Sequence, residues 1–319
     1  MIDSYNTSHT PVMLKEVLEQ LQAKSGDIYV DGTFGAGGYS KAILNSANCI
    51  LYCIDQDPAV AEFANKLKKE YGSRFKFIAG NFSELNELMS SQNIMRVDGI
   101  VLDLGVSSMQ LETPDRGFSF MHKGRLDMRM SKTGSDAYNF INKSTEEEIA
   151  NVIYNYGGET KSRRIAKRII EKRRISPIET TLELADIVRS VVKKGKSKID
   201  PATRTFQAIR ISVNDELASL QSALLASERL LNNNGKLIVV SFHSLEDAIV
   251  KEFINERAKP KQSGSRYLPC ITNTEFKPTF KWKVNKTIVA SEEEIKTNPR
   301  SRSAKLRVAI RINQEVDHA

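Results

Sequence analysis

The sequence predicts an α/β protein with a doubly wound, mostly parallel β-sheet that is interrupted by an all-helical domain. Strand-like and helix-like stretches alternate through the first hundred residues. Strand signal then disappears over roughly residues 131–200 and returns near the C-terminus. Alternating strands and helices are typical of parallel sheets covered by helices. A chain of 319 residues also exceeds the usual size of a single core. We expect residues 1–130 and 205–319 to form the sheet domain and residues 131–204 to form the helical insertion.

The first part of the chain should contain four strands with helices between them. Helices are expected at residues 11–21, after the glycines around residues 41–45, and at residues 58–71, where Pro58 suits a first helical turn. Strands are expected at residues 28–32, 49–55, 75–80 and 97–105.

The insertion shows helical periodicity only. Helices are expected at residues 144–157, 161–174 and 181–194. Thr145 and Glu148 have the spacing of a capping box, and Gly157–Gly158 suits a helix end. The last two strands are expected at residues 235–242 and 304–312.

Composition and charge narrow the possible partners. The formal net charge is +8 with a pI of about 9.2, which favours a polyanion as partner. No apolar run is long enough to span a membrane, and no signal-peptide pattern begins the chain. Cys49 and Cys53 share one apolar strand and should be buried thiols, which suits a reducing cytoplasm. The four histidines form no zinc pattern, so no metal is expected.

A glycine-rich turn follows the first strand, in the segment YVDGTFGAGGYSK at residues 29–41. Such turns are typical of dinucleotide and nucleoside cofactor sites, although a purely structural tight turn is the alternative. Gly35 and Gly37 could begin a dinucleotide fingerprint, but its third glycine is replaced by Ser40. Asp31 beside the turn would repel a diphosphate and would suit an ammonium or sulfonium group. S-adenosylmethionine carries both, and we expect it to bind here.

Residues at the next two strand ends agree with a nucleoside site. Asp55 ends the second strand, where a carboxylate can accept both ribose hydroxyls. Phe82 follows the third strand and could pack against adenine, with Asn81 at the edge of the base. Taken singly, Asp55 could be a helix cap and Phe82 a core residue.

Asp103 ends the fourth strand, which in this architecture faces the donor methyl group. It could accept a hydrogen bond from an exocyclic amine such as cytosine N4 and take the released proton. We therefore expect Asp103 to be catalytic. The alternative is a helix cap or a cofactor contact only.

Two other features suggest substrate contacts. His243 follows the fifth strand, has no evident acid partner, and should bind substrate or shape the site rather than ionise in catalysis. Residues 161–174 hold eight basic side chains and one acid around an isoleucine stripe. A solvated helix face is the ordinary explanation. Because KKGKSK at residues 193–198 follows in the same insertion, a phosphate-binding surface is favoured, with the residues Arg163, Arg164, Lys167 and Arg168.

The chain resembles a known family. The segments HTPVMLKEVL, DGTFGAGGYS, VLDLGVSSMQL, ATRTFQAIRISVNDEL, VVSFHSLED and NPRSRSAKLRVA are similar, in order, to the bacterial small-subunit ribosomal RNA cytosine-N4 methyltransferases of the MraW type. The resemblance covers nearly the whole chain. It implies a Rossmann-like class I methyltransferase domain with a helical insertion, S-adenosylmethionine as donor, and a cytidine of the decoding region as acceptor.

The resemblance also implies which residues contact the cofactor. The family positions carry over to Gly37, Gly38, Tyr39, Asp55, Phe82, Asp103 and Gln110; Asp31 and Gly35 join this set from the turn itself. Two residues depart from the family pattern: Tyr39 stands where His is usual, and Met109 where Pro is usual. The family leaves the catalytic base open, so that role for Asp103 comes from its position alone.

Three functions are compatible with the sequence. The first is the RNA methyltransferase. The second is an S-adenosylmethionine-binding RNA-binding or ribosome-assembly factor that transfers no methyl group. The third is a nicotinamide dehydrogenase, which Asp31 and the missing third glycine disfavour. Naked RNA and the assembled small subunit are both open as substrates, and monomer and dimer are both open as states of the chain.

Overall fold

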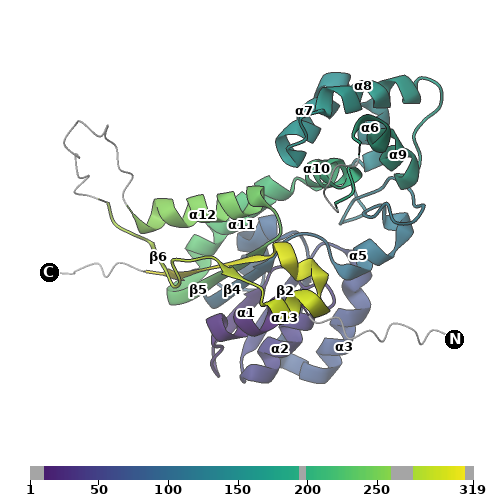
Figure 1. Ribbon diagram of the computed structural model, residues 1–319. Coiled ribbons are helices and arrows are strands. Elements are labelled where there is room, and N and C mark those ends of the chain that lie inside the picture. Colours follow the sequence, from purple (N-terminus) through teal and green to yellow (C-terminus); the bar gives the residue numbers. More distant parts are fainter. Residues whose placement is uncertain (1–10, 194–198, 260–275, 313–319) are drawn as a thin grey trace, which may run out of the picture. The chain divides into compact units, whose positions relative to one another are not determined.

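The computed structural model describes residues 11–193, 199–259 and 276–312 (Figure 1). These residues form two compact units. The first contains the described residues up to Gly105 and those from Ala218 onward, and the second is Val106–Leu217.

The first unit is built on one eight-stranded sheet. Its strand order is β3-β2-β1-β4-β5-β8-β6, with β7 also paired to β8. Strands β1 to β5 are parallel, and β6 to β8 join the edge in antiparallel pairs. The strands are β1 Ile28–Asp31, β2 Ile50–Asp55, β3 Phe75–Ala79, β4 Val97–Asp103, β5 Leu231–Ser241, β6 Phe280–Trp282, β7 Ile288–Val289 and β8 Lys305–Arg311. The predicted α/β class with a mostly parallel sheet is confirmed.

Helices cover both faces of this sheet, with α1, α2 and α3 on one face and α11 and α12 on the other (Figure 1). The helices are α1 Leu14–Leu21, α2 Gly38–Ser46, α3 Ala61–Tyr71, α4 Leu85–Ser91, α11 Glu216–Leu230, α12 Ser244–Ala258 and α13 Glu292–Thr297.

Alternation along the strands decides which face each residue meets. Val30, Ile54 and Leu102 point into the core shared with α4, α11 and α12. Their neighbours therefore point to the opposite face, where Cys53 is buried against Ser40 of α2. Cys49 and Cys53 are both buried free thiols, as predicted.

The second unit is helical, with a core of its own. Its helices are α5 Ser108–Glu112, α6 Ala137–Lys143, α7 Glu146–Gly157, α8 Ser162–Arg173, α9 Thr181–Val191 and α10 Ala202–Asn214. The predicted cap of α7 is present: Thr145 and Glu148 form a capping box, and Gly158 ends the helix in a left-handed conformation.

The second unit is longer than the predicted insertion, residues 131–204. Phe118, Leu126 and Met128 lie before residue 131 in a stretch without helical periodicity, yet they are buried among the helices of this unit. Phe206 and Ile209 of α10 complete the same core. Packing therefore sets this boundary, and the periodicity of the sequence does not mark it. Among the described helices, none is long and apolar enough to cross a membrane.

Candidate functional site

Three aspartates of the first unit end neighbouring parallel strands. Asp31 ends β1, Asp55 ends β2 and Asp103 ends β4. All three follow residues that point into the α11–α12 core, so their side chains share the other face. The strand order reverses between β1 and β4, because β1 pairs with β2 on one side and with β4 on the other. Ligands of doubly wound sheets bind at such a reversal, beyond the carboxyl ends of the strands.

Asp31 is fully buried and hydrogen-bonded. Its Oδ1 accepts the Thr33 N–H at 3.1 Å, and its Oδ2 accepts the Ser40 hydroxyl at 2.6 Å. Burial raises the pKa of Asp31 to about 6; the Ser40 and Thr33 bonds oppose this rise, and the charge of Asp55 adds to it. Asp31 therefore lies in a place where a carboxylate charge is poorly compensated.

Asp55 supports the glycine turn. Its Oδ2 accepts the Gly35 N–H at 2.7 Å, and its Oδ1 accepts the Asp57 N–H at 2.8 Å. Burial raises the pKa of Asp55, although backbone hydrogen bonds from Asp57, Gly35 and Gln56 lower it. With these three bonds to about four acceptor sites, the carboxylate can accept one more hydrogen bond.

Asp103 is tied to the first turn through its backbone. Its N–H donates to the Thr33 hydroxyl at 2.7 Å. Its side-chain Oδ1 is buried and has no hydrogen-bond partner among the described residues. Burial, and then the nearby charges of Asp31 and Glu246, raise the pKa of Asp103 well above its usual range. A buried carboxylate oxygen without a partner is costly, and a ligand that donates a hydrogen bond or carries a positive charge would offset this cost.

The turn glycines are explained by packing within the protein. A Cβ on Gly32 would lie 2.5 Å from Leu102, and one on Gly38 would lie 2.3 Å from Pro11. Gly37 has a φ of 79°, and a Cβ there would meet the Phe34 ring at 2.9 Å. These glycines therefore require no ligand to account for them, and only their backbone groups remain as ligand contacts to propose.

Tyr39 and Phe82 both make contacts within the protein. Tyr39 is buried in the first turn of α2, and its hydroxyl donates to the Val12 carbonyl. Phe82 directly follows the Asn81 cap after β3 and is half-buried against the core. The Asn81 amide is occupied, because it donates to Gln56 and accepts the Ser83 N–H.

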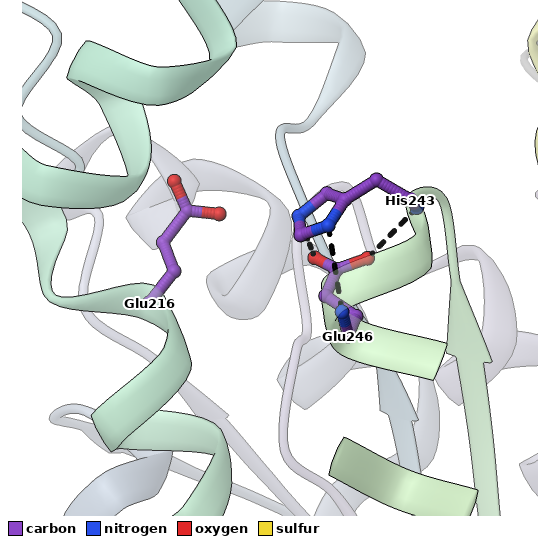
Figure 2. Close-up of side chains that lie close together, drawn as sticks. All are labelled: Glu216, His243 and Glu246. Atoms are coloured by element: carbon purple, nitrogen blue, oxygen red, sulfur yellow. Dashed lines mark hydrogen bonds and ion pairs between the residues drawn. The ribbon is translucent and has the colours of Figure 1, made fainter. Parts of the chain in front are cut away.

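His243 has an acid partner that the sequence analysis did not find. His243 is the N-cap of α12, and its Nδ1 accepts the Glu246 N–H at 3.4 Å (Figure 2). Its Nε2 lies 3.1 Å from Oε1 of Glu246, although the contact lacks hydrogen-bond geometry. The other oxygen of Glu246 accepts the N–H of Phe242 at 2.8 Å. The expectation of a lone histidine was wrong because S-L-E after His243 follows a capping-box spacing with His in place of Ser or Thr.

The remaining predicted residues belong to the second unit. Gln110 is buried in a capping box with Ser107, in which its Oε1 accepts the Ser107 N–H at 3.0 Å. In α8, Ile165 and Ile169 are buried, whereas the predicted basic residues are exposed: Arg163, Arg164, Lys167 and Arg168. One of these, Arg168, pairs with Glu171 at 3.0 Å.

Thr33 and Ser40 are parts of the site that no sequence pattern indicated. Thr33 joins the ends of β1 and β4, and Ser40 holds the Asp31 carboxylate. Within the described residues, no lysine or arginine forms an ion pair with Asp31, Asp55 or Asp103. The site therefore fits an organic ligand with positive charge and hydroxyl donors.

Comparison with known proteins adds the family. A model of the MraW methylase family matches residues 6–312 of this chain. A ribosomal RNA small subunit methyltransferase H from Wolbachia sp. subsp. Drosophila simulans is 54% identical over 307 residues, covering 96% of this chain and 100% of the relative. The protein of the same name from Rickettsia massiliae is 51% identical over 302 residues, covering 95% and 97%.

Proposed function

Because the chain belongs to the MraW methylase family, we propose that it methylates small-subunit ribosomal RNA with S-adenosylmethionine as donor. More specifically, we propose that the acceptor is the N4 amine of a cytidine in the decoding region. The observation that carries this proposal is the buried Oδ1 of Asp103, which has no hydrogen-bond partner in the part of the chain that the structure describes, beside the second buried carboxylate of Asp31. Ribosomal RNA as substrate also implies a cytoplasmic location.

The residues of the first unit fit the donor. Asp31 would hold its ammonium group, Asp55 would accept a hydrogen bond from its ribose, and Phe82 would pack against its adenine. Backbone groups of the turn at Gly35, Gly37 and Gly38, with Tyr39 behind them, would line its methionine end. Gln110 remains a proposed contact from the second unit. When bound, S-adenosylmethionine supplies an electrophilic methyl group on a positively charged sulfur.

Asp103 would act on the acceptor. A positive charge next to this carboxyl group lowers its pKa and favours the ionised form. The free Oδ1 can then accept an N–H from the exocyclic amine, whose lone pair is otherwise delocalised into the ring. This hydrogen bond orients the nitrogen, and the Asp103 carboxylate then accepts its proton. Base catalysis of this kind typically raises the rate about 10²- to 10⁴-fold. The Thr33 hydroxyl accepts the Asp103 N–H and so fixes the backbone of Asp103.

RNA would be held by the charged face of α8. The four exposed basic residues named above lie on the side opposite to the isoleucines that fix the helix in the core. Lysine and arginine side chains on such a face bind phosphates without reading sequence. His243, fixed by Glu246, is the proposed substrate contact of the first unit.

Transfer of tritium tests the proposal. Purified chain, tritiated S-adenosylmethionine and small subunits from cells that lack the gene should yield labelled RNA. Asp103→Asn keeps the shape of the side chain but not its charge, so the rate should fall at least about 10²-fold. Cofactor affinity should fall much less. No label with the parent chain, despite cofactor binding, would favour the assembly factor; equal losses of binding and rate in the variant would make Asp103 a cofactor ligand only.

A further inference from the structure

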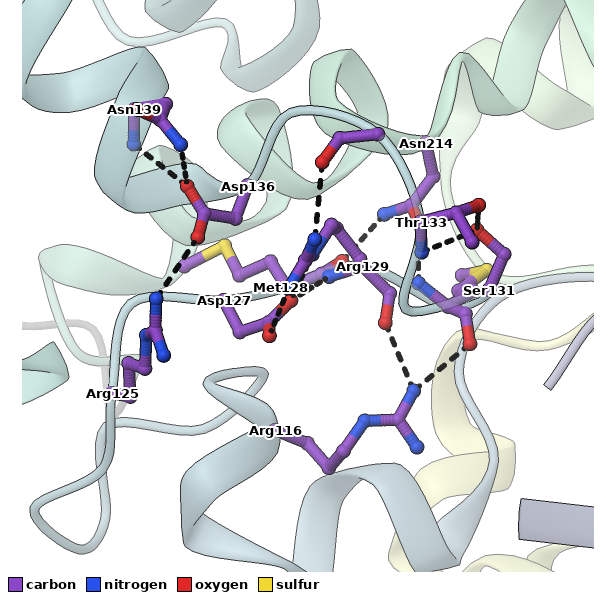
Figure 3. A network of polar contacts seen from close by, with 12 residues as sticks. Arg116, Arg125, Asp127, Met128, Arg129, Ser131, Thr133, Asp136, Asn139 and Asn214 are labelled. Atoms are coloured by element: carbon purple, nitrogen blue, oxygen red, sulfur yellow. Dashed lines mark hydrogen bonds and ion pairs between the residues drawn. The ribbon is translucent and has the colours of Figure 1, made fainter. Parts of the chain in front are cut away.

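The irregular segment between α5 and α6 is held in one defined conformation (Figure 3). Arg116 is buried, and its Nη2 donates to the carbonyls of Arg129 at 2.9 Å and Met130 at 3.0 Å. Asn214 accepts the Met130 N–H at 2.8 Å and donates to the Met128 carbonyl at 2.7 Å. Met128 is fully buried with a φ of 60°, a left-handed conformation that costs on the order of 1–3 kcal/mol. Strain of this kind persists only where the surroundings impose it, and it often accompanies function.

The outer part of this segment, residues 121–125, is fixed as well; we call it the basic tip. Thr181 at the start of α9 donates through Oγ1 to the His122 carbonyl at 3.0 Å and accepts the Gly124 N–H at 3.1 Å. Its own N–H donates to the Gly124 carbonyl at 2.9 Å. A Cβ on Gly124 would lie 1.8 Å from the Pro114 carbonyl oxygen, so only glycine fits.

The basic tip presents cations and apolar surface to solvent. Lys123, Arg125 and His122 are exposed, and Met121 is 76% exposed. No acidic residue lies within the tip. The exposed Met121 side chain therefore lies beside two exposed cations, on a backbone held by the Thr181 hydrogen bonds.

The acids near the tip are already engaged. Oδ1 of Asp136 accepts two hydrogen bonds from Asn139 at 2.7 and 2.8 Å, and its Oδ2 forms an ion pair with Arg125 at 3.6 Å. Glu183, the acid near Lys123, caps α9 through the N–H groups of Glu179 and Thr180. The Arg125 side chain is 66% exposed in spite of this ion pair, and Lys123 is exposed as well, so both cations can still contact an anionic partner from the solvent.

We propose that the basic tip is a second RNA-binding surface, in which Lys123 and Arg125 contact phosphates and Met121 and His122 pack against an unpaired base. The inference rests on the proposed function, which makes RNA the substrate. Single-stranded RNA offers both phosphates and splayed bases that stack on side chains. A tip fixed before binding loses little conformational freedom on binding, which favours affinity.

A neutralised tip tests the phosphate contacts. The double variant Lys123→Gln, Arg125→Gln adds no acid next to Asp136. Its control is Lys68→Gln, Lys69→Gln, which removes the same charge from the exposed side of α3. Affinity for a short single-stranded RNA is measured against KCl concentration. For two lost phosphate contacts, the slope of log affinity against log salt should shrink by roughly 1.4. If the plots of the parent and the variant meet at 1 M KCl, the affinity at 0.1 M should fall roughly 25-fold.

The apolar contacts have a different signature. Met121→Ala and His122→Ala should weaken RNA binding at least about 5-fold while the salt slope stays that of the parent, because stacking is not a charge effect. Thr181→Val removes the hydroxyl that clamps the tip and should act in the same way, provided that its melting temperature shows a folded protein.

The outcomes separate the two proposals. If the tip variants bind RNA as the parent does, and the parent methylates RNA, only the proposal that the basic tip binds RNA is overturned. Equal losses of RNA affinity in the tip and α3 variants also overturn this proposal, because the losses would then reflect the change in net charge only. A parent chain that neither binds nor methylates RNA overturns the proposed function and the tip together. S-adenosylmethionine affinity should be the same in all variants.

Discussion

Replacing Asp31 with Asn should weaken S-adenosylmethionine binding. It should also raise the stability of the ligand-free protein, relative to the parent, as the pH increases. Asp31 is fully buried, and its pKa rises from 3.8 to about 6 on folding. A raised carboxyl pKa contributes stability at low pH, and this contribution is lost as pH rises through the folded value. The full shift corresponds to about 3 kcal/mol, of which about 2 kcal/mol develops between pH 4.5 and pH 8. Asn keeps an acceptor for the Thr33 N–H and can donate to Ser40, so the local geometry should survive.

Denaturant unfolding of the parent and the variant, both without ligand, measures this effect. The stability of Asp31→Asn minus that of the parent should increase by about 2 kcal/mol from pH 4.5 to pH 8. Any constant offset from the amide cancels in this difference. Calorimetry at pH 8 should show S-adenosylmethionine affinity reduced by about 1.5–3 kcal/mol, the scale of a charge-assisted hydrogen bond. A stability difference that does not change with pH would refute the buried, poorly compensated charge, and unchanged affinity would remove Asp31 from the cofactor site.

Three further variants test other parts of the site. Asp55→Ala should weaken S-adenosylmethionine binding by about 1.5–3 kcal/mol, measured by calorimetry, and unchanged affinity would remove it from the ribose contact. Thr33→Val should slow methyl transfer about tenfold because the Asp103 N–H loses its acceptor, whereas Thr33→Ser should keep the parental rate; equal rates in all three proteins would show that the tie is unimportant. Replacing four basic residues of α8 with Glu should lower the salt slope of RNA binding by roughly 0.7 per lost contact and leave cofactor affinity unchanged; the residues are Arg163, Arg164, Lys167 and Arg168. A slope equal to that of the parent would show that this face is only solvated.

The sheet and its acidic edge could be predicted because they depend on local patterns. Strands such as Val97–Asp103 appear in the sequence as apolar runs between turn signals, and parallel strands bring their carboxyl ends to one edge. Asp31, Asp55 and Asp103 therefore had to lie near one another once the alternation of strands and helices was recognised.

Other parts of the site depend on contacts between distant segments. The bond from Asp103 to Thr33 joins residues 70 positions apart and follows from the register of β1 against β4. The glycines suggested a ligand at the backbone, whereas Leu102 and Pro11 already exclude side chains at Gly32 and Gly38. None of these contacts has a local signal in the sequence, because each depends on which side chains the fold brings together.

Mapping the methylated nucleotide tests the central claim most directly. Small-subunit RNA from cells with and without the gene is digested and analysed by mass spectrometry, and the gene-less RNA is also treated with purified chain and S-adenosylmethionine. The account predicts one methyl group on the N4 amine of a decoding-region cytidine, absent without the gene and restored by the parent chain but not by Asp103→Asn. A methyl group on another atom or another nucleotide, or identical RNA from both cells, would contradict it.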